Sequence, residues 1–250
     1  MHLEGRMSVQ AAFAAGRRTI QSILVGNEAS EEKLEDVLAE ARRRGIPVKH
    51  VPETTLDQLA HGRTHGGLLA ICTGRPPDEV SVLESIFAGS DPAFLLLLEG
   101  ADDPRNLGWT LRTAEALGVH GVLLKRRNWD LDETAVMRAS SGAFDRLRIL
   151  QVAREDGMID GLRSRGLSIW SCLPHERRSV YDADLRSPLV LAVGGEKRGL
   201  SGEVRDRCTG FLSIPTMPGA TSLSMSHAAA ILMAEVTRQR RASTSVKREG

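Results

Sequence analysis

The stretch Phe94-Leu95-Leu96-Leu97-Leu98 is an unbroken apolar run, and Glu99-Gly100-Ala101-Asp102-Asp103-Pro104 follows it directly. Such a run is typical of a strand covered on both faces, as in the parallel sheets of α/β proteins. Short apolar runs recur, mostly separated by helix-like stretches, at residues 121–124, 147–152, 167–172, 189–193 and 211–214. This alternation predicts an α/β fold with a mostly parallel sheet and flanking helices.

The first 75 residues predict a separate, smaller α/β unit. Ser30 is a natural N-cap for a helix that runs to Arg44, and Gly45 ends it. Leu34, Val37, Leu38 and Ala41 recur at helical spacing within that stretch. Strands are expected at residues 19–25, 47–51 and 68–73, and further helices at residues 8–15 and from about residue 56.

Composition shifts set the other boundaries. Pro76-Pro77 and the acidic stretch after them predict a linker over residues 76–92. The main domain then covers residues 93–241, with a last helix from about 223 to 240. Residues 242–250 are polar and basic, so we expect a disordered tail.

Composition excludes several classes of protein. The 250 residues are 41% hydrophobic and 26% charged, an ordinary globular mix that needs no disulfide or metal to fold. The three cysteines are scattered, which favours a reducing, cytoplasmic setting. The longest apolar run is too short to span a bilayer, and no signal-peptide pattern opens the chain. The seven histidines form no HExxH motif, so we expect no metal, and His65 and His227 as hydrogen-bonded structural residues.

Charge alone does not predict nucleic-acid binding, because 33 basic and 32 acidic residues leave a net charge of +1. Local basic clusters are either RNA contacts or solvated surface. They are Arg17-Arg18, Arg42-Arg43-Arg44, Lys125-Arg126-Arg127 and the group Arg238, Arg240 and Arg241.

Familiar nucleotide-binding motifs do not occur. No GxGxxG turn follows the first strand of the main domain, which argues against a Rossmann-type site. The loop Gly194-Gly195-Glu196-Lys197-Arg198-Gly199 lacks the spacing of a P-loop. A GxSxG nucleophile elbow is also missing.

Three segments nevertheless place polar or charged side chains close to the ends of expected strands. The first, residues 103–118, has Asn106 placed to cap a helix that ends at Gly118. Arg112 lies in an otherwise apolar stretch of that helix, either as a surface residue or as a cation for a phosphate or ribose.

The second and third segments are loops that follow strands. In residues 189–201 a buried strand opens into Gly194-Gly195, whose backbone can approach a flat ligand, and Glu196 adds a carboxylate. Residues 212–226 pass through a Pro/Gly loop to a helix start rich in hydroxyls, where Ser222 or Ser224 could simply be the cap.

Together with Val136-Met137-Arg138-Ala139-Ser140-Ser141-Gly142-Ala143, these segments resemble the motifs of the SpoU (TrmH) family of RNA 2′-O-ribose methyltransferases, in the SPOUT superfamily. The resemblance covers roughly residues 93–240. The first 75 residues resemble the ribosomal-protein-like substrate-binding domain of many members. There, Thr64-His65-Gly66-Gly67-Leu68-Leu69-Ala70 is similar to the usual His-Gln-Gly segment, with Gly66 in place of Gln.

The resemblance implies a knotted C-terminal domain that holds S-adenosylmethionine and works as a homodimer, with each site completed across the subunit interface. By motif, the cofactor-binding residues are Gly194, Gly195, Ile214 and Leu223. It also implies structured RNA as substrate, and the extra N-terminal domain favours ribosomal over transfer RNA.

The same resemblance implies a set of catalytic residues. Arg112 would hold the target phosphate and stabilise the developing alkoxide; a guanidinium is a costly base. Asn106 and Ser222 would orient the ribose and Arg112, and Glu196 would fix the loop or the arginine.

One position departs from the family. The third motif usually reads Ser-Leu-Asn, whereas this chain has Ser222-Leu223-Ser224. A hydroxyl replaces only part of an amide's hydrogen bonding. The alternative function is therefore an RNA-binding protein that holds the cofactor with weak or lost methyl transfer.

Overall fold

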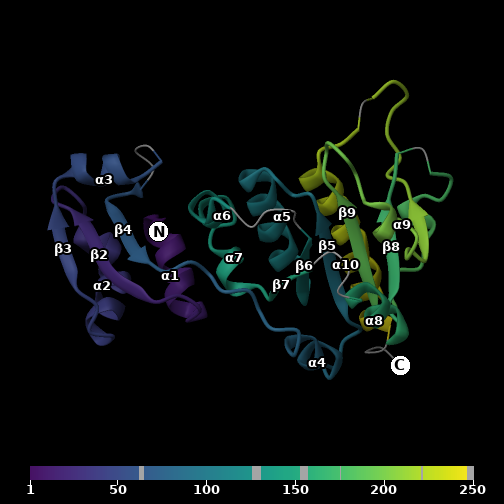
Figure 1. Ribbon diagram of the computed structural model, residues 1–250, viewed down its shortest axis with the longest axis horizontal. Helices are drawn as coiled ribbons and strands as arrows, with labels where there is room; N and C mark the ends of the chain where they lie inside the picture. The colour runs from purple at the N-terminus through teal and green to yellow at the C-terminus, as the bar shows by residue number, and fades with distance from the viewer. Residues whose placement is uncertain (62–64, 126–130, 153–156, 175, 221, 247–250) are drawn as a thin grey trace. The chain divides into compact units, whose positions relative to one another are not determined.

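The computed structural model describes residues 1–61, 65–125, 131–152, 157–174, 176–220 and 222–246 (Figure 1). The chain forms two compact units. One contains Met1–Pro76, Leu107–Arg112 and Asp130–Arg146; the other contains Pro77–Asn106, Thr113–Trp129 and Leu147–Gly250.

The first unit is built on a four-stranded sheet in the order β1-β4-β2-β3. Strand β2 pairs parallel with β3 and antiparallel with β4, and β4 pairs antiparallel with β1. The strands are β1 (His2–Glu4), β2 (Ile20–Gly26), β3 (Val48–Val51) and β4 (Leu68–Cys72). Three of them match the predicted strands. The three-residue β1 is too short to produce a periodic signal, and the sequence analysis missed it.

Among the described residues, this unit contains part of α5 (Leu107–Arg112) and the helices α1 (Gly5–Ala15), α2 (Glu31–Arg43), α3 (Glu53–Leu59), α6 (Glu133–Ala139) and α7 (Ala143–Arg146). Helix α2 buries the expected apolar face: Leu34, Val37, Leu38 and Ala41. Ser30 occupies its N-cap position, but the Ser30 side chain makes no capping hydrogen bond.

A buried ion-pair network joins the start of β2 to α6 and α7. Arg18 Nε donates to Asp145 Oδ2 at 2.7 Å, and both side chains are fully buried. Arg18 Nη1 also donates to Glu133 Oε2 at 2.6 Å. Burial lowers the pKa of Arg18, but the two carboxylates outweigh it and leave that pKa raised. The charged guanidinium of Arg18 is therefore held inside the unit, where the carboxylates of Asp145 and Glu133 offset the cost of removing its charge from water.

The second unit contains a six-stranded parallel sheet in the order β10-β8-β9-β5-β6-β7. Its strands are β5 (Phe94–Glu99), β6 (Gly121–Lys125), β7 (Ile149–Gln151), β8 (Ser168–Cys172), β9 (Leu189–Gly194) and β10 (Gly210–Leu212). All six lie where apolar runs predicted strands, and the α/β fold with a parallel sheet is confirmed. The knot stays a prediction.

Helices α5 (Pro104–Ala116), α8 (Met158–Ser164), α9 (Gly202–Arg205) and α10 (Met225–Val246) connect or follow these strands, and a 3₁₀ turn covers Val180–Asp182. The sheet interior packs as expected for a doubly covered layer. Leu95, Leu97 and Val190 of the sheet share a buried cluster with residues of α8 and of α4 (Val82–Phe87) (Figure 1).

Strands β5 and β9 pair at the centre of the sheet, with Glu99 beside Gly194 at their carboxyl ends. After β5 the chain continues to β6 on one side; after β9 it continues to β10 on the other. Ligands of open α/β sheets bind where connections diverge in this way, beyond the carboxyl ends of the strands. The fold thus places the first two motif segments at the edge of the sheet where ligands of such folds generally bind.

Three boundaries differ from the sequence analysis. The predicted linker contains α4, because Leu83 and Ile86 are buried in the core of the second unit. The predicted disordered tail from residue 242 is wrong as far as Val246, where α10 ends; residues 247–250 lie outside the described residues. Asn106 is not the helix cap, since Asp103 occupies that position and accepts hydrogen bonds from Arg105 N and Asn106 N.

Among the helices that the structure describes, none has the length and apolar character needed to cross a bilayer.

Replacing Arg18 tests the buried network. Arg18→Met preserves bulk but leaves Asp145 buried without its cation, so the free energy of unfolding should fall by about 3 kcal/mol. Urea denaturation measures the change. Arg43→Met is the matched control, because it removes an exposed partner of Glu40 and should have little effect. Equal losses in the two variants would contradict a structural role for the network.

Candidate functional site

The loop after β9 lies directly against the loop after β5. Gly195 N donates to the Glu99 carbonyl at 2.7 Å, and Gly199 N donates to the Gly195 carbonyl at 2.9 Å. A Cβ on Gly195 would lie 2.2 Å from the Gly100 carbonyl oxygen, and one on Gly194 would lie 2.3 Å from the Gly199 carbonyl carbon. The glycine pair is therefore required by contact between backbones within the protein, a reason that the sequence analysis did not foresee.

Charged side chains at the ends of the strands hold the C-terminal end of the loop after β9, at Ser201. Glu99 accepts hydrogen bonds from Ser201 N at 2.8 Å and from Ser201 Oγ at 3.1 Å. The Lys125 Nζ lies 3.4 Å from Glu99 Oε1 and donates to Glu203 Oε2 at 2.7 Å. Both ends of the loop are thus fixed to strand ends of the sheet.

Asn106 joins the three motif segments. Its Nδ2 donates to Glu196 Oε1 at 3.2 Å, and its Oδ1 accepts a hydrogen bond from Ser226 Oγ at 3.3 Å. Because an amide has one donating and one accepting arm, these two contacts also fix its orientation. Glu196 and Ser226, which lie 90 and 120 positions after Asn106 in the sequence, therefore both contact the Asn106 side chain. Ser226 was missed as a site residue; its only sequence signal is its place at the end of the third motif.

The third segment contributes a hydroxyl-rich helix start. Ser224 Oγ lies 3.1 Å from Ser226 Oγ and 2.6 Å from His227 Nδ1. It also accepts a 3.4 Å hydrogen bond from His227 N, so Ser224 is the serine that caps α10. His227 is hydrogen-bonded, as predicted, and so is His65, which lies 3.1 Å from Asp57 Oδ1.

The remaining residues of this segment are more open. Ile214 comes two residues after β10 and is half-buried. Leu223 is 39% exposed, and Ser222 is exposed. The Ser222 side chain forms no hydrogen bond to the described residues, whereas Ser226 does reach Asn106.

Arg112 lies on α5, six residues after Asn106, and its side chain is exposed. Within the part of the chain that the structure describes, its guanidinium has no hydrogen-bond or ion-pair partner. Six residues correspond to about 9 Å along a helix and about 120° around its axis from Asn106. Arg112 therefore faces a different side of α5 from the amide.

Most of the basic clusters are already paired with acids or carbonyls. Arg42, Arg43 and Arg44 form ion pairs with Glu35 and Glu40. The cluster at Lys125 is engaged as described above, and its Arg126-Arg127 lies outside the described residues. Arg238 pairs with Glu235. Arg240 donates to the carbonyls of Pro92, Ala93 and Ser187. These pairings reduce the charge available for RNA at each cluster.

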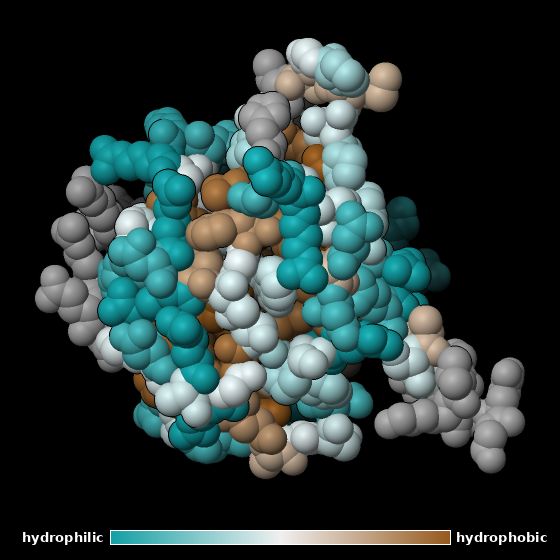
Figure 2. Space-filling model, turned by 90° about the vertical axis from the view of Figure 1, so that its right-hand side faces the viewer, coloured by the Kyte–Doolittle hydropathy of each residue, from teal (hydrophilic) through white to brown (hydrophobic). Residues whose placement is uncertain are grey.

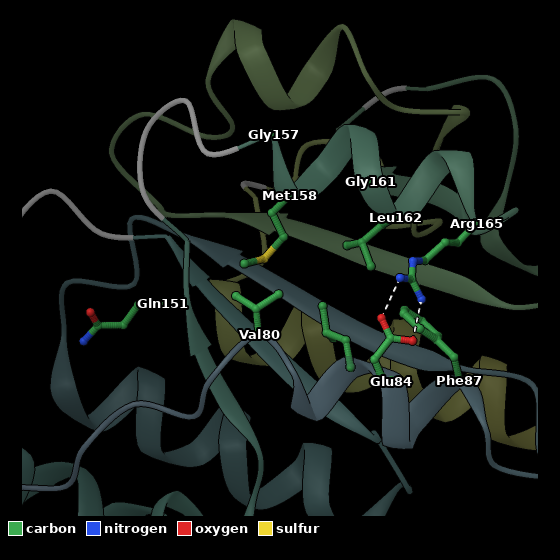
Figure 3. Close-up of a pocket in the computed structure, with 10 residues that line it drawn as sticks. Val80, Glu84, Phe87, Gln151, Gly157, Met158, Gly161, Leu162 and Arg165 are labelled. Carbon is green, nitrogen blue, oxygen red and sulfur yellow. Dashed lines mark hydrogen bonds and ion pairs between the residues drawn. The ribbon is translucent and has the colours of Figure 1, made fainter.

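A cavity of about 460 Å³ lies between α4 and α8 in the second unit (Figure 3). Val80, Phe87, Met158 and Leu162 line it, and Glu84 and Arg165 form a two-hydrogen-bond ion pair at its side, 2.5 and 3.0 Å long. None of the predicted site residues is among those that line it. This cavity is therefore separate from the site at Asn106.

Figure 2 shows the face on the side of β8 and α9, where hydrophilic residues surround smaller hydrophobic patches. Exposed apolar side chains of the second unit include Met217, 79% exposed, which comes from the loop before α10. The third motif segment thus offers apolar as well as hydroxyl groups to solvent.

A parallel α/β sheet whose carboxyl edge gathers three loop segments around one amide defines a ligand-binding α/β protein. Comparison with known families is more specific. Residues 93–234 match the model of the SpoU rRNA Methylase family, and residues 2–77 match the substrate-binding model of RNA 2′-O ribose methyltransferases. The chain belongs to the SpoU family of RNA methyltransferases.

Individual relatives agree with this assignment. The chain is 32% identical over 237 residues to a protein of Staphylococcus haemolyticus assigned to the TrmH family of tRNA/rRNA methyltransferases, covering 94% of both chains. It is 34% identical over 242 residues to an uncharacterized tRNA/rRNA methyltransferase of Mycobacterium avium, covering 95% of this chain and 77% of the other.

Solved structures are similar along nearly the whole chain. One is an RNA 2′-O ribose methyltransferase, with a TM-score of 0.80 and 29% identity, covering 96% of this chain and 88% of the other. Another is the AdoMet-bound rRNA methyltransferase of Sinorhizobium meliloti, with a TM-score of 0.78 and 25% identity, covering 95% and 86%.

The tight contact at Gly195 generates a prediction. Gly195→Ala forces a methyl group against the Gly100 carbonyl and should lower the free energy of unfolding by about 2 kcal/mol. Gly202→Ala is the matched control, since a Cβ there meets nothing within 4 Å. Chemical denaturation compares the two. If Gly195→Ala is as stable as Gly202→Ala, the close contact between the loops is not required.

Proposed function

We propose that this chain transfers a methyl group from S-adenosylmethionine to the 2′-hydroxyl of a ribose in structured RNA, ribosomal RNA being favoured over transfer RNA. The observation that carries the proposal is the Asn106 amide, which joins Glu196 and Ser226 at the ligand-binding edge of the sheet. Support also comes from the family and from the similar AdoMet-bound rRNA methyltransferase of S. meliloti.

The residues at this edge fit an adenosine-bearing cofactor. The backbone of this loop can hydrogen-bond a flat base, and the exposed side chain of Leu223 gives it an apolar face. Gly194, Gly195, Ile214 and Leu223 would hold the cofactor. When bound, S-adenosylmethionine supplies an activated methyl group on a sulfonium that leaves readily.

The protein then has two tasks, alignment and charge stabilisation. A ribose hydroxyl is a weak nucleophile that loses its proton as it attacks, so a cation beside the developing oxyanion lowers the barrier. Arg112 is the cation we assign to this role, together with a hold on the adjoining phosphate. Asn106 and Ser222 would orient the ribose, and Glu196 would keep the loop in place.

The direction of Arg112 favours a homodimer. Arg112 faces about 120° away from Asn106 around α5. The simplest role for its guanidinium is therefore to act in the site of a second copy of the chain. We therefore propose that each site is completed across a subunit interface, that the C-terminal domain is knotted, and that the first unit holds the RNA. A substrate of this kind places the reaction in the cytoplasm.

Methyl transfer from radiolabelled S-adenosylmethionine to purified bacterial rRNA and tRNA tests the proposal. Arg112→Ala should reduce transfer by roughly a hundredfold or more, because the oxyanion loses its cation. Binding of S-adenosylmethionine, measured by calorimetry, should stay close to wild type. Arg163→Ala, which removes an exposed arginine of α8, is the control and should transfer normally. Wild-type turnover in Arg112→Ala would remove Arg112 from the mechanism.

Ser224→Asn separates the alternative function. If the wild-type chain binds S-adenosylmethionine and RNA but transfers slowly, and Ser224→Asn restores transfer, the protein is an RNA-binding member with weakened catalysis. Mapping the 2′-O-methyl positions in each RNA then identifies the substrate.

A further inference from the structure

His2, Glu4 and His61 bring three potential metal ligands together in the first unit, and none of them belongs to the three motif segments. Their ligand atoms all lie within 4.8 Å of one another. No other group of three potential metal ligands lies this close together among the described residues. Glu4 Oε1 is 3.5 Å from His2 Nε2 and 2.9 Å from His61 Nδ1. Sequence analysis expected no metal because the seven histidines form no HExxH motif, and here 57 positions separate Glu4 from His61.

The spacing matches a tetrahedral ion. With Zn–N and Zn–O bonds near 2.1 Å, neighbouring ligand atoms of a tetrahedral zinc site lie about 3.4 Å apart. The two distances at Glu4 Oε1 fall on either side of that value. Two imidazoles and one carboxylate are also ligands that zinc prefers.

The hydrogen bonding of the group is incomplete without a cation. His2 Nε2 is buried and has no hydrogen-bond partner. Both ring nitrogens of His61 face carboxylates, Nδ1 toward Glu4 and Nε2 toward Asp132 Oδ2 at 3.4 Å. A neutral imidazole has only one N–H, so it cannot donate to both. One divalent cation at the centre would take the lone pairs of His2 Nε2 and His61 Nδ1 and leave His61 Nε2–H for Asp132.

The surroundings form a second layer around such an ion. A carboxylate on the far nitrogen of a ligating histidine is a common arrangement at zinc, and Asp132 supplies it. Arg138 Nη1 donates to Glu4 Oε2 at 3.0 Å, and the backbone N of His61 donates to Glu4 Oε1 at 2.7 Å, so the second lone pair of Oε1 would serve the ion. Thr134 Oγ1 donates to the His2 carbonyl at 2.7 Å and holds β1 in place.

The charge of Glu4 is suited to the same role. Its two carboxylate oxygens accept hydrogen bonds from His61 N at 2.7 Å and from Arg138 Nη1 at 3.0 Å. The Glu4 side chain is fully buried, so the carboxylate is held ready in one position.

We propose that His2, Glu4 and His61 bind one divalent transition-metal ion, with zinc as the best match, and that the ion ties β1 to the end of α3 as a structural clip. The fourth position would be taken by water. The role is independent of methyl transfer, because the ligands belong to the first unit and to none of the three motif segments.

Zinc binding to the full-length, tag-free protein tests the proposal. After dialysis against a chelator, calorimetric titration with zinc chloride should give one ion per chain, and cobalt(II) should give the visible absorption of a four-coordinate site. His61→Ala, a half-exposed position, should weaken zinc binding at least a hundredfold, and His2→Ala should do the same. His50→Ala is the matched control, because His50 is an exposed histidine of the same unit beside Glu31, and it should bind zinc as the wild type does.

Thermal unfolding gives a second readout. Zinc should raise the melting temperature of the wild type and of His50→Ala but not of His61→Ala, since a ligand that binds only the folded state stabilises it. Circular dichroism in chelator shows whether each variant is folded. The proposal is overturned if the folded wild type takes up no zinc, or if folded His61→Ala binds it equally well.

Discussion

One amide holds the site together. Asn106 lies in the first turn of α5, just after the central strand of the sheet, and its two arms reach the loop after β9 and the start of α10. A single side chain thus connects three segments that are distant in the sequence. The arrangement works because Asp103, and not Asn106, caps the helix. Because Asp103 accepts the hydrogen bonds of the cap, the Asn106 side chain contacts Glu196 and Ser226 instead.

The amide can act only because the loops around it are fixed first. Backbone contact at Gly195 and the hydrogen bonds of Glu99 to Ser201 set the loop after β9 against the loop after β5. Glu196 is then carried to Asn106 by a loop that is fixed at both ends. The two glycines permit the close packing of this loop, which holds the Glu196 carboxylate in place, and they would contribute to the proposed cofactor binding only indirectly.

The sequence was sufficient for the fold because its signals are strong and local. Six apolar runs predicted six strands, and a parallel sheet followed from their alternation with helices. The misses have physical reasons. Strand β1 is three residues long, and helix α4 has only two buried residues within a stretch that reads as acidic linker. Helix α10 continues through a polar stretch whose composition resembles disorder.

The site was predictable in part. Asn106 and Glu196 were identified from motif resemblance, but the contact with Ser226 depends on how the third segment returns to α5, which spacing does not encode. Similarly, the role of Arg18 was invisible, because an Arg-Arg pair gives no hint that one member is buried between Asp145 and Glu133. The group of His2, Glu4 and His61 could not be predicted for the same reason, because only the folded chain brings these three residues together.

The most direct test of the central claim is calorimetric titration of S-adenosylmethionine into the wild type and into Asn106→Asp. This substitution keeps the shape of the side chain but removes the amide donor and places a carboxylate against Glu196. The account predicts binding by the wild type and affinity at least tenfold weaker in the variant, with the fold intact by circular dichroism. Equal affinity in the two proteins, or no uptake by the wild type, would contradict it.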